Sequence, residues 1–479
     1  MAFSTPFFPL LGPLLFGRAS RPSLAQYASQ LPKVESISAL REAFDSLCPD
    51  SLFTPPAKSR QRLFTPVLTF WTFLSQVLCP GSSCRDAVRK AQSWWAGHLR
   101  IKISASTSAY CQARLRLLQP QLERIHRHVC NRMEANAPSQ RLWRGRSVKV
   151  VDGTGLSMPD TPANQEAYPQ STSQKPGCGF PLMKLLGIFS LSSGALLHFD
   201  QDSHYVHESQ IFVKLWPHFS KGDIVLADRA FSSFLALGSL LAQGVDSLMR
   251  LHGRRKVDFR KGKSLGHNDQ LVLWRRPSPS AVDHHHDKLA LLPMTILLRQ
   301  IAFQVQIKGF RTRRIILVTT LLDPVAFPAE ALCQLYFQRW NVETHFRELK
   351  TLLALDVLRC EAPAMIHKEL LVHVIAYNLV RSVMQTAAIL HHVDLDRVSF
   401  KGTLDTLMRF ADAIQAAQDK PRRQAQLLET MFALIAKDLL PVRPARCEPR
   451  ARKRRPKFFP GLKKPRRQQH PAHPKQALT

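Results

Sequence analysis

Residues 147–153 read Ser-Val-Lys-Val-Val-Asp-Gly, and at this stretch the chain changes from helical to β-type patterning. Its three valines are β-branched, as is common in strands, and the Asp-Gly pair is typical of a strand end or a turn. We therefore expect a strand that stops at Asp152. The sequence on either side extends this prediction to a mixed α/β protein.

Further strands and helices are predicted downstream. Two apolar runs joined by Ser-Ser-Gly predict a hairpin at 185–199, and a short apolar run predicts a strand at 224–227 that ends at Asp228. A last strand is expected at 315–320. Helical spacing of apolar residues predicts helices at 235–242, 329–353 and 366–390.

The chain before residue 147 has helical patterning. Apolar residues recur at helical spacing at 63–78 and again at 114–129, with a turn-rich segment at 80–83 between them. We interpret this region as a small helical domain. Residues 245–314 alternate β-like segments with glycine-rich and basic turns, so we interpret them as an insertion.

Length and charge restrict the class of protein. A chain of 479 residues predicts two or more domains, and a net charge of +32 favours a polyanionic partner such as nucleic acid. A membrane is the weaker choice, because no apolar run approaches the ~20 residues that span a bilayer, and we recognise no secretion signal. The nine cysteines are scattered without a Cys-x-x-Cys pair, which argues against disulfides or structural zinc and fits a reducing cytoplasm.

Three acidic residues occupy places where chemistry is expected. Asp152 and Asp228 follow predicted strands, and Glu343 lies inside the predicted helix at 329–353. Strand ends and a neighbouring helix can converge, and carboxylates are the ligands that Mg²⁺ prefers. Two such ions about 4 Å apart can activate an attacking oxygen and stabilise a leaving oxygen in phosphoryl transfer.

The predicted helix supports the choice of Glu343. At ~100° per residue, Glu343 shares a stripe about 60° wide with a tyrosine, an arginine and a lysine. Glu348 lies about 140° away, so we expect its replacement to have little effect. A carboxylate flanked by phosphate donors suits a metal site on DNA. The donors on or beside the stripe are Tyr336, Arg339, Trp340, Arg347 and Lys350.

The same residues resemble a known family. Tyr336, Arg339, Glu343 and Lys350 match the Tyr-x2-Arg-x3-Glu-x6-Lys signature of DDE transposases in the large fourth family of bacterial insertion sequences. Segments around both aspartates and near the N-terminus resemble the family as well, and Ala230 departs from its usual glycine. These segments are 151–154, 157–162, 222–229 and 106–114, and the resemblance covers about 36–390.

The resemblance implies a ribonuclease-H-like core with a helical N-terminal domain and an inserted, mostly β subdomain. It implies binding of terminal inverted repeats in double-stranded DNA, pairing of the ends by a homodimer, Mg²⁺-dependent cutting, and joining of the 3′-OH to target DNA. Asp152, Asp228 and Glu343 would hold two Mg²⁺ ions, with Mn²⁺ as a substitute. Tyr336, Arg339 and Lys350 would hold phosphates, with Trp340 and Arg347 beside them, and the enzyme would act on the bacterial nucleoid.

With the resemblance, the predicted organisation has seven parts. They are an N-terminal tail (1–35), a helical DNA-binding domain (36–138), the first part of the core (139–244), the β insertion (245–314), the second part of the core with the catalytic helix (315–390), a C-terminal helical region (391–440) and a basic disordered tail (441–479).

Each site residue also has an ordinary explanation. Asp152-Gly153 could form a hairpin turn, Asp228 could cap the following helix, and Glu343 could pair with Arg339 and Arg347 on a solvated face. The order and context of the three acids together favour catalysis. Trp340 could belong to the core or stack on a displaced base, an interaction worth ~1–3 kcal/mol. The histidines at 284–286, 345, 367 and 373 are interpreted as loop or structural residues.

Two other functions remain open on the sequence. A nuclease or resolvase with the same core would cut without joining, so joined products would distinguish a transposase from it. A DNA-binding protein or inactive transposase remnant would show no Mg²⁺-dependent cleavage. Inverted repeats in the DNA that flanks the coding region would favour the mobile element.

The last 39 residues generate the first prediction. They carry 13 Lys and Arg residues against the single acid Glu448, so removal of residues 441–479 should delete sequence-independent binding to phosphates. The slope of log affinity against log salt is expected to flatten by about 0.9 for each phosphate that the tail neutralises. Filter binding or fluorescence anisotropy across a salt series measures this slope, and an unchanged slope would exclude DNA as the partner of the tail.

Overall fold

The computed structural model describes residues 63–98, 104–278, 285–305, 313–417, 420–441, 461–465 and 468. The predicted N-terminal tail, positions 36–62 of the predicted helical domain, His284 and most of the predicted basic tail lie outside these residues.

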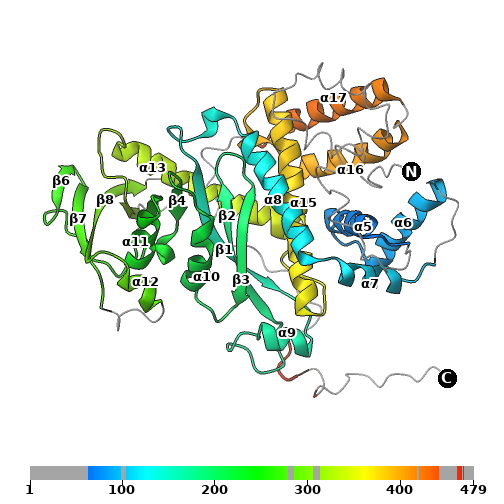
Figure 1. Ribbon diagram of the computed structural model, residues 1–479, viewed down its shortest axis with the longest axis horizontal. Helices are drawn as coiled ribbons and strands as arrows, with labels where there is room; N and C mark the ends of the chain where they lie inside the picture. The colour runs from blue at the N-terminus through cyan, green and yellow to red at the C-terminus, as the bar shows by residue number, and fades with distance from the viewer. Residues whose placement is uncertain are drawn as a thin grey trace.

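A mixed sheet forms the centre of the described part of the chain (Figure 1). β1 is parallel to β4 and β4 is parallel to β5, whereas the other neighbours are antiparallel. The strands within these residues are, in sheet order, β3 (Leu196–Ser203), β2 (Leu182–Ser190), β1 (Val148–Ser157), β4 (Ile224–Ala227), β5 (Asp246–Arg250), β9 (Arg313–Thr319), β8 (Thr295–Val305), β7 (Asp269–Arg275) and β6 (Lys263–Gly266).

The strand β1 is longer than expected. The prediction that it stops at Asp152 is wrong, because its antiparallel pairing with β2 continues from Lys149 to Ser157. The parallel pairing of β1 with β4 ends earlier, at Val151 opposite Ala227. Asp152 therefore lies inside a strand, at the point where one of its two neighbouring strands ends.

The segment 245–314, interpreted as an insertion, contributes to the same sheet. It opens with β5, a parallel neighbour of β4, so this strand continues the central part of the sheet. The remaining strands, β6 to β8, extend the sheet beyond β9. The predicted hairpin is confirmed as β2 and β3, and the strands predicted at 224–227 and 315–320 are present as β4 and β9.

Helices cover both faces of the sheet. On one face, α10 (Glu208–Leu215), α11 (Phe234–Ala242) and α12 (His286–Ala290) bury apolar side chains against residues such as Val151 and Val225. On the other face, α8 (Gln119–Ala135) and α15 (Pro363–Leu390) pack with residues such as Val150 and Leu226. Neighbouring strand positions point to opposite faces, so alternate residues of β1 and β4 enter the two different cores.

The helical N-terminal unit consists of α5 (Pro66–Leu78), α6 (Cys84–His98) and α7 (Ser108–Arg116). Thr65 caps α5 by accepting from the Leu68 N–H, and Pro66 suits the first helical turn. The continuous helical spacing predicted at 114–129 is broken, because α7 ends at Arg116 and α8 begins at Gln119. Pro120 explains the break, since proline fits the first turn of a helix but not its interior.

The helix predicted at 329–353 is present as one irregular run. It comprises α13 (Ala329–Phe337), the 3-10 turn η6 (Gln338–Trp340), α14 (Asn341–Arg347) and the π turn η7 (Glu348–Leu352). The tight turn η6 buries Arg339, and the wide turn η7 buries Glu348. A uniform rotation of 100° per residue therefore fails at both turns.

The remaining helices pack around α15. These are α9 (Pro162–Ala167), α16 (Phe400–Ala416) and α17 (Pro421–Lys437), of which α16 and α17 lie beside α15 at the far side from the sheet (Figure 1). Within the described residues, no helix has the length and apolar character needed to cross a membrane.

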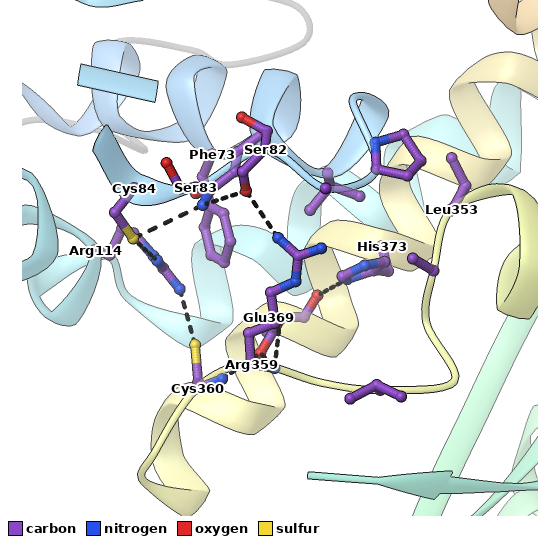
Figure 2. A pocket seen from close by; sticks show the side chains of 16 residues that line it. Phe73, Ser82, Ser83, Cys84, Arg114, Leu353, Arg359, Cys360, Glu369 and His373 are labelled. Carbon is purple, nitrogen blue, oxygen red and sulfur yellow. Dashed lines mark hydrogen bonds between the residues drawn. The ribbon is translucent and has the colours of Figure 1, made fainter. Parts of the chain in front are cut away.

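A buried arginine joins the N-terminal unit to the segment that precedes α15. Arg114 of α7 donates to the sulfur of Cys84 at 3.3 Å and to the sulfur of Cys360 at 2.8 Å (Figure 2). These residues line a cavity of about 280 Å³, and Arg359, which also lines it, donates to Ser82 O at 2.8 Å. Since Asp152, Asp228 and Glu343 do not line this cavity, we interpret it as part of the junction between the helical unit and the core.

Candidate active site

Two neighbouring parallel strands bring Asp152 and Asp228 to the same edge of the sheet. Val151 opposite Ala227 is the last pair of β1 and β4, and the two aspartates are the next residues. Neighbouring strands lie about 4.8 Å apart, so the two backbones are close. The preceding residues, Val151 and Ala227, bury their side chains in the core beneath α10 and α11. Because the backbone is extended at both aspartates, the side chains of Asp152 and Asp228 point to the opposite face of the sheet. That face is the one on which α14 packs against β1.

The local backbone fixes one oxygen of each aspartate. Asp152 Oδ1 accepts from the Gly153 N–H at 2.9 Å, and Asp228 Oδ1 accepts from the Arg229 N–H at 2.6 Å. Asp228 thereby caps the short 3-10 helix η4 (Arg229–Phe231). The helix predicted at 235–242 is capped by Ser233, which accepts from the Ala236 N–H, so the alternative that Asp228 caps this helix is wrong. The second carboxylate oxygen of Asp228 is left for other partners.

Arg339 lies between Asp152 on β1 and Glu343 on α14. Its Nη1 atom lies 3.6 Å from Asp152 Oδ2, and its Nη2 atom lies 3.7 Å from Glu343 Oε1. Arg339 is 7% exposed, whereas the side chain of Glu343 is 54% exposed. Glu343 is therefore accessible from solvent while its arginine partner belongs to the protein interior.

The three acids influence one another electrostatically. The pKa of Asp152 is raised to about 6, mainly by burial; the Gly153 N–H and Arg339 oppose this increase, and the charges of Asp228 and Glu343 add to it. Within the described residues, no three His, Cys, Asp or Glu side chains are gathered as a metal-binding cluster. The acids thus share one neighbourhood, with a guanidinium between two of them, and are not arranged as a ligand shell.

The aromatic residues of the predicted stripe lie around Arg339. Tyr336 is 2% exposed, and its ring centroid lies 5.8 Å from the Arg339 guanidinium. Burial raises the pKa of Tyr336 to about 12, so its hydroxyl keeps its proton at neutral pH. Trp340 is 37% exposed and stacks on Phe337, with ring centroids 5.3 Å apart. One face of Trp340 is therefore covered by the protein.

The two basic residues beyond Glu343 differ in their surroundings. Lys350 Nζ donates to Thr154 Oγ1 and to Gly155 O, both at 3.1 Å, so the lysine contacts β1 two residues after Asp152. Arg347 is exposed at the C-terminal end of α14. The ion pair of Glu343 within the described residues is with Arg339.

Glu348, which the helical geometry placed away from the acids, is buried. It is 5% exposed and lies 3.5 Å from His345 Nδ1 and 3.9 Å from Arg381 Nη1. Arg381, which is 2% exposed in α15, was not among the residues predicted from the sequence. An arginine within the apolar run of α15 was a signal that a buried acid should face it.

The departure at Ala230 carries no strain. Ala230 lies in η4, and it is not among the residues with a positive φ angle. A glycine is needed at such a position only where the backbone is left-handed. The turn after Asp228 is therefore compatible with alanine.

The histidines have structural surroundings, as expected for those in helices. His345 and His373 are buried, and His373 Nδ1 lies 2.8 Å from Glu369 O. His367 contacts the Tyr168 hydroxyl and the Gln201 side chain.

Three comparisons relate this chain to known proteins. A family model described as "Transposase DDE domain" matches residues 143–379, which include the three acids. The chain is 26% identical over 356 residues to the transposase InsG of insertion sequence element IS4 from Escherichia coli (strain K12), covering 74% of this chain and 78% of that protein. A structure of the piggyBac transposase synaptic complex with hairpin DNA has a TM-score of 0.42 at 10% identity, covering 92% of this chain and 86% of that chain.

The raised pKa of Asp152 predicts a dependence of stability on pH. Below the unfolded pKa of 3.8, Asp152 is protonated in both states and does not lower the free energy of unfolding. Between pH 3.8 and about 6 its ionisation lowers the free energy of unfolding progressively, and above pH 6 the loss is constant. In metal-free buffer at pH 8, Asp152→Asn is expected to raise the free energy of unfolding by about 1–3 kcal/mol. Urea unfolding at pH 8 and pH 4 tests this, and a variant less stable than the wild type at pH 8 would contradict it.

Proposed function

Because this chain belongs to the DDE transposases, in the group represented by the IS4 transposase, we propose that it moves an insertion sequence by cut-and-paste. It binds the terminal inverted repeats, hydrolyses the DNA at the element ends, and joins each 3′-OH to target DNA. The observation that carries this proposal is that Asp152 and Asp228 follow paired strand positions while Arg339 lies between Asp152 and Glu343.

The acids fit a hard divalent cation. DDE transposases depend on divalent metal ions, and we propose two Mg²⁺ ions here, with Mn²⁺ as a substitute. Asp152, Asp228 and Glu343 offer only carboxylate oxygens. Mg²⁺ prefers such oxygen ligands to nitrogen or sulfur ligands. When bound, the ions activate the attacking oxygen and stabilise the leaving oxygen. The raised pKa of Asp152, caused first by burial and to a smaller extent by the charges of Asp228 and Glu343, is a further reason for a cation at this place.

Arg339 is well suited to hold the cleaved end. Its planar fork lies against two carboxylates at 3.6 and 3.7 Å, which are longer than ordinary charged hydrogen bonds. A phosphate would offer the same fork shorter contacts, while a divalent cation would compensate the carboxylates. Arg339 therefore binds the terminal phosphate in this proposal.

Other donors surround the same phosphates. Tyr336 keeps its hydroxyl proton and donates it, since its pKa lies near 12. Lys350 lies against β1 beside Asp152, and Arg347 is exposed at the end of α14. The uncovered face of Trp340 is proposed to stack on a base displaced at the cut end.

The architecture fits the same interpretation. We propose that β1 to β5, β9 and the run from α13 to α15 form a ribonuclease-H-like core, with β6 to β8 as its inserted part. The helical unit of α5 to α7 would contact the repeats, and a homodimer would pair the two ends on the nucleoid. The net charge of +32 supports double-stranded DNA as the partner.

A nuclease of the same architecture remains the competing function. Both enzymes would use the same acids for the first cut, so cleavage alone does not distinguish them. Recovery of element ends covalently joined to a target plasmid supports a transposase. Cleaved ends without joined products, under conditions where both DNAs are bound, would favour the nuclease.

Glu343→Gln provides the test of the third carboxylate. The amide keeps the shape of the side chain and removes the charge, and it is a far poorer ligand for a hard cation. Mg²⁺-dependent cutting and joining should fall by at least about a hundredfold, while binding to element ends stays nearly unchanged. A gel assay for cleavage and a binding titration on the same duplex measure both effects.

The matched control is Glu330→Gln, which changes an exposed glutamate in the first turn of α13 on the same helical run. It should behave as the wild type. Asp152→Asn and Asp228→Asn should follow Glu343→Gln. An active Glu343→Gln enzyme would rule out the proposed ligand set.

Arg339→Lys tests the proposed phosphate interaction. Lysine keeps the charge but loses the planar fork that grips a phosphate in two places. The single-turnover cleavage rate should fall by about tenfold or more, with a smaller loss of affinity for the duplex. Equal losses in cleavage rate and affinity, or a lower midpoint of thermal unfolding than in the wild type, would assign Arg339 a structural role instead.

A further inference from the structure

A buried charge pair connects the catalytic helix, the run from α13 to η7, to α15. Glu348 lies at the first position of the π turn η7, and Arg381 lies on α15. Their carboxylate and guanidinium atoms approach to 3.9 Å, and both side chains are at most 6% exposed. Lys350, two residues further along the same turn, contacts β1 instead.

Arg381 also touches the central sheet. Gly194, in the turn between β2 and β3, has a φ of +74°, and any side chain there would collide with the Arg381 guanidinium. Tyr377, one turn earlier on α15, donates to Gly194 O at 2.8 Å. The arginine thus lies between a fixed turn of the sheet and the end of the catalytic helix.

The π turn depends on Glu348. The Leu353 N–H donates to Glu348 O at 3.1 Å, five residues away, so the turn holds more residues than an α-helical turn. Glu348 therefore defines the wide turn through its carbonyl and anchors it through its side chain. The geometry of this turn decides where Lys350 points.

The pair is poorly optimised for stability. Glu348 Oε2, His345 Nδ1, and Arg381 Nε and Nη2 are buried without hydrogen-bond partners among the described residues. Buried charges with incomplete hydrogen bonding are often no more stabilising than apolar residues of the same size. A role other than stability is therefore needed to explain the pair.

Building on the proposed function, we propose that Glu348 and Arg381 are positioning residues of the reaction. Their pair fixes the π turn against the sheet so that Lys350 lies beside Asp152 and Glu343 faces the two strand acids. Neither residue touches the DNA, and both act through Lys350 and Glu343.

A double-mutant cycle tests the coupling. Glu348→Gln, Lys350→Met and the double variant are compared in single-turnover cleavage of a duplex that carries the inverted repeat flanking this coding region. Glu348→Gln is expected to cost about tenfold alone and less than about threefold in the Lys350→Met background. Losses that multiply independently would overturn the proposal.

A second variant separates positioning from folding. Glu348→Leu combined with Arg381→Met replaces the pair by apolar side chains, so the midpoint of thermal unfolding should stay near the wild type. Its affinity for the duplex should be unchanged, its cleavage rate about tenfold lower, and its Mg²⁺ requirement higher. A wild-type cleavage rate per folded molecule, whatever the melting temperature, would show that the pair serves stability alone.

The two proposals fail in different ways. The proposed function fails if the wild type does not cleave this duplex or if Glu343→Gln still cleaves it. The positioning role fails if the wild type cleaves, Glu343→Gln does not, and the Glu348 and Arg381 variants cleave like the wild type.

Discussion

Two parallel strands that stop pairing at the same place are the constraint on which the rest of the site depends. β1 and β4 separate after Val151 and Ala227, and each continues with an aspartate on the same face of the sheet. β1 remains held by β2 on its other side, so Asp152 sits on a rigid strand and not on a loop. A third acid then needs only a helix packed on that face, which α14 supplies.

Charge compensation is the second theme. The chain carries +32 overall, yet it gathers three acids at one edge of the sheet, where Asp152 has a pKa near 6. Arg339 compensates two of them at distances longer than ordinary charged hydrogen bonds. Acidic and basic side chains therefore alternate over a short distance at this edge of the sheet.

The irregular helix connects the site to the rest of the protein. A tight turn directs Arg339 inward and leaves Trp340 partly exposed, and a wide turn directs Glu348 inward toward Arg381. Arg339 and Lys350 hold the run against β1, and Glu348 holds it against α15. The catalytic side chains therefore depend on packing well beyond their immediate neighbours.

The sequence by itself determined the α/β class, the hairpin and the strand before Asp228, because these depend on local patterns and on spacing within single elements. It also placed Tyr336, Arg339 and Lys350 with Glu343. Only the tertiary structure decided that Asp152 lies within a strand and that Glu348 is buried against Arg381. Those features depend on which distant segments pair and pack, and a rotation of 100° per residue along one helix carries no information about them.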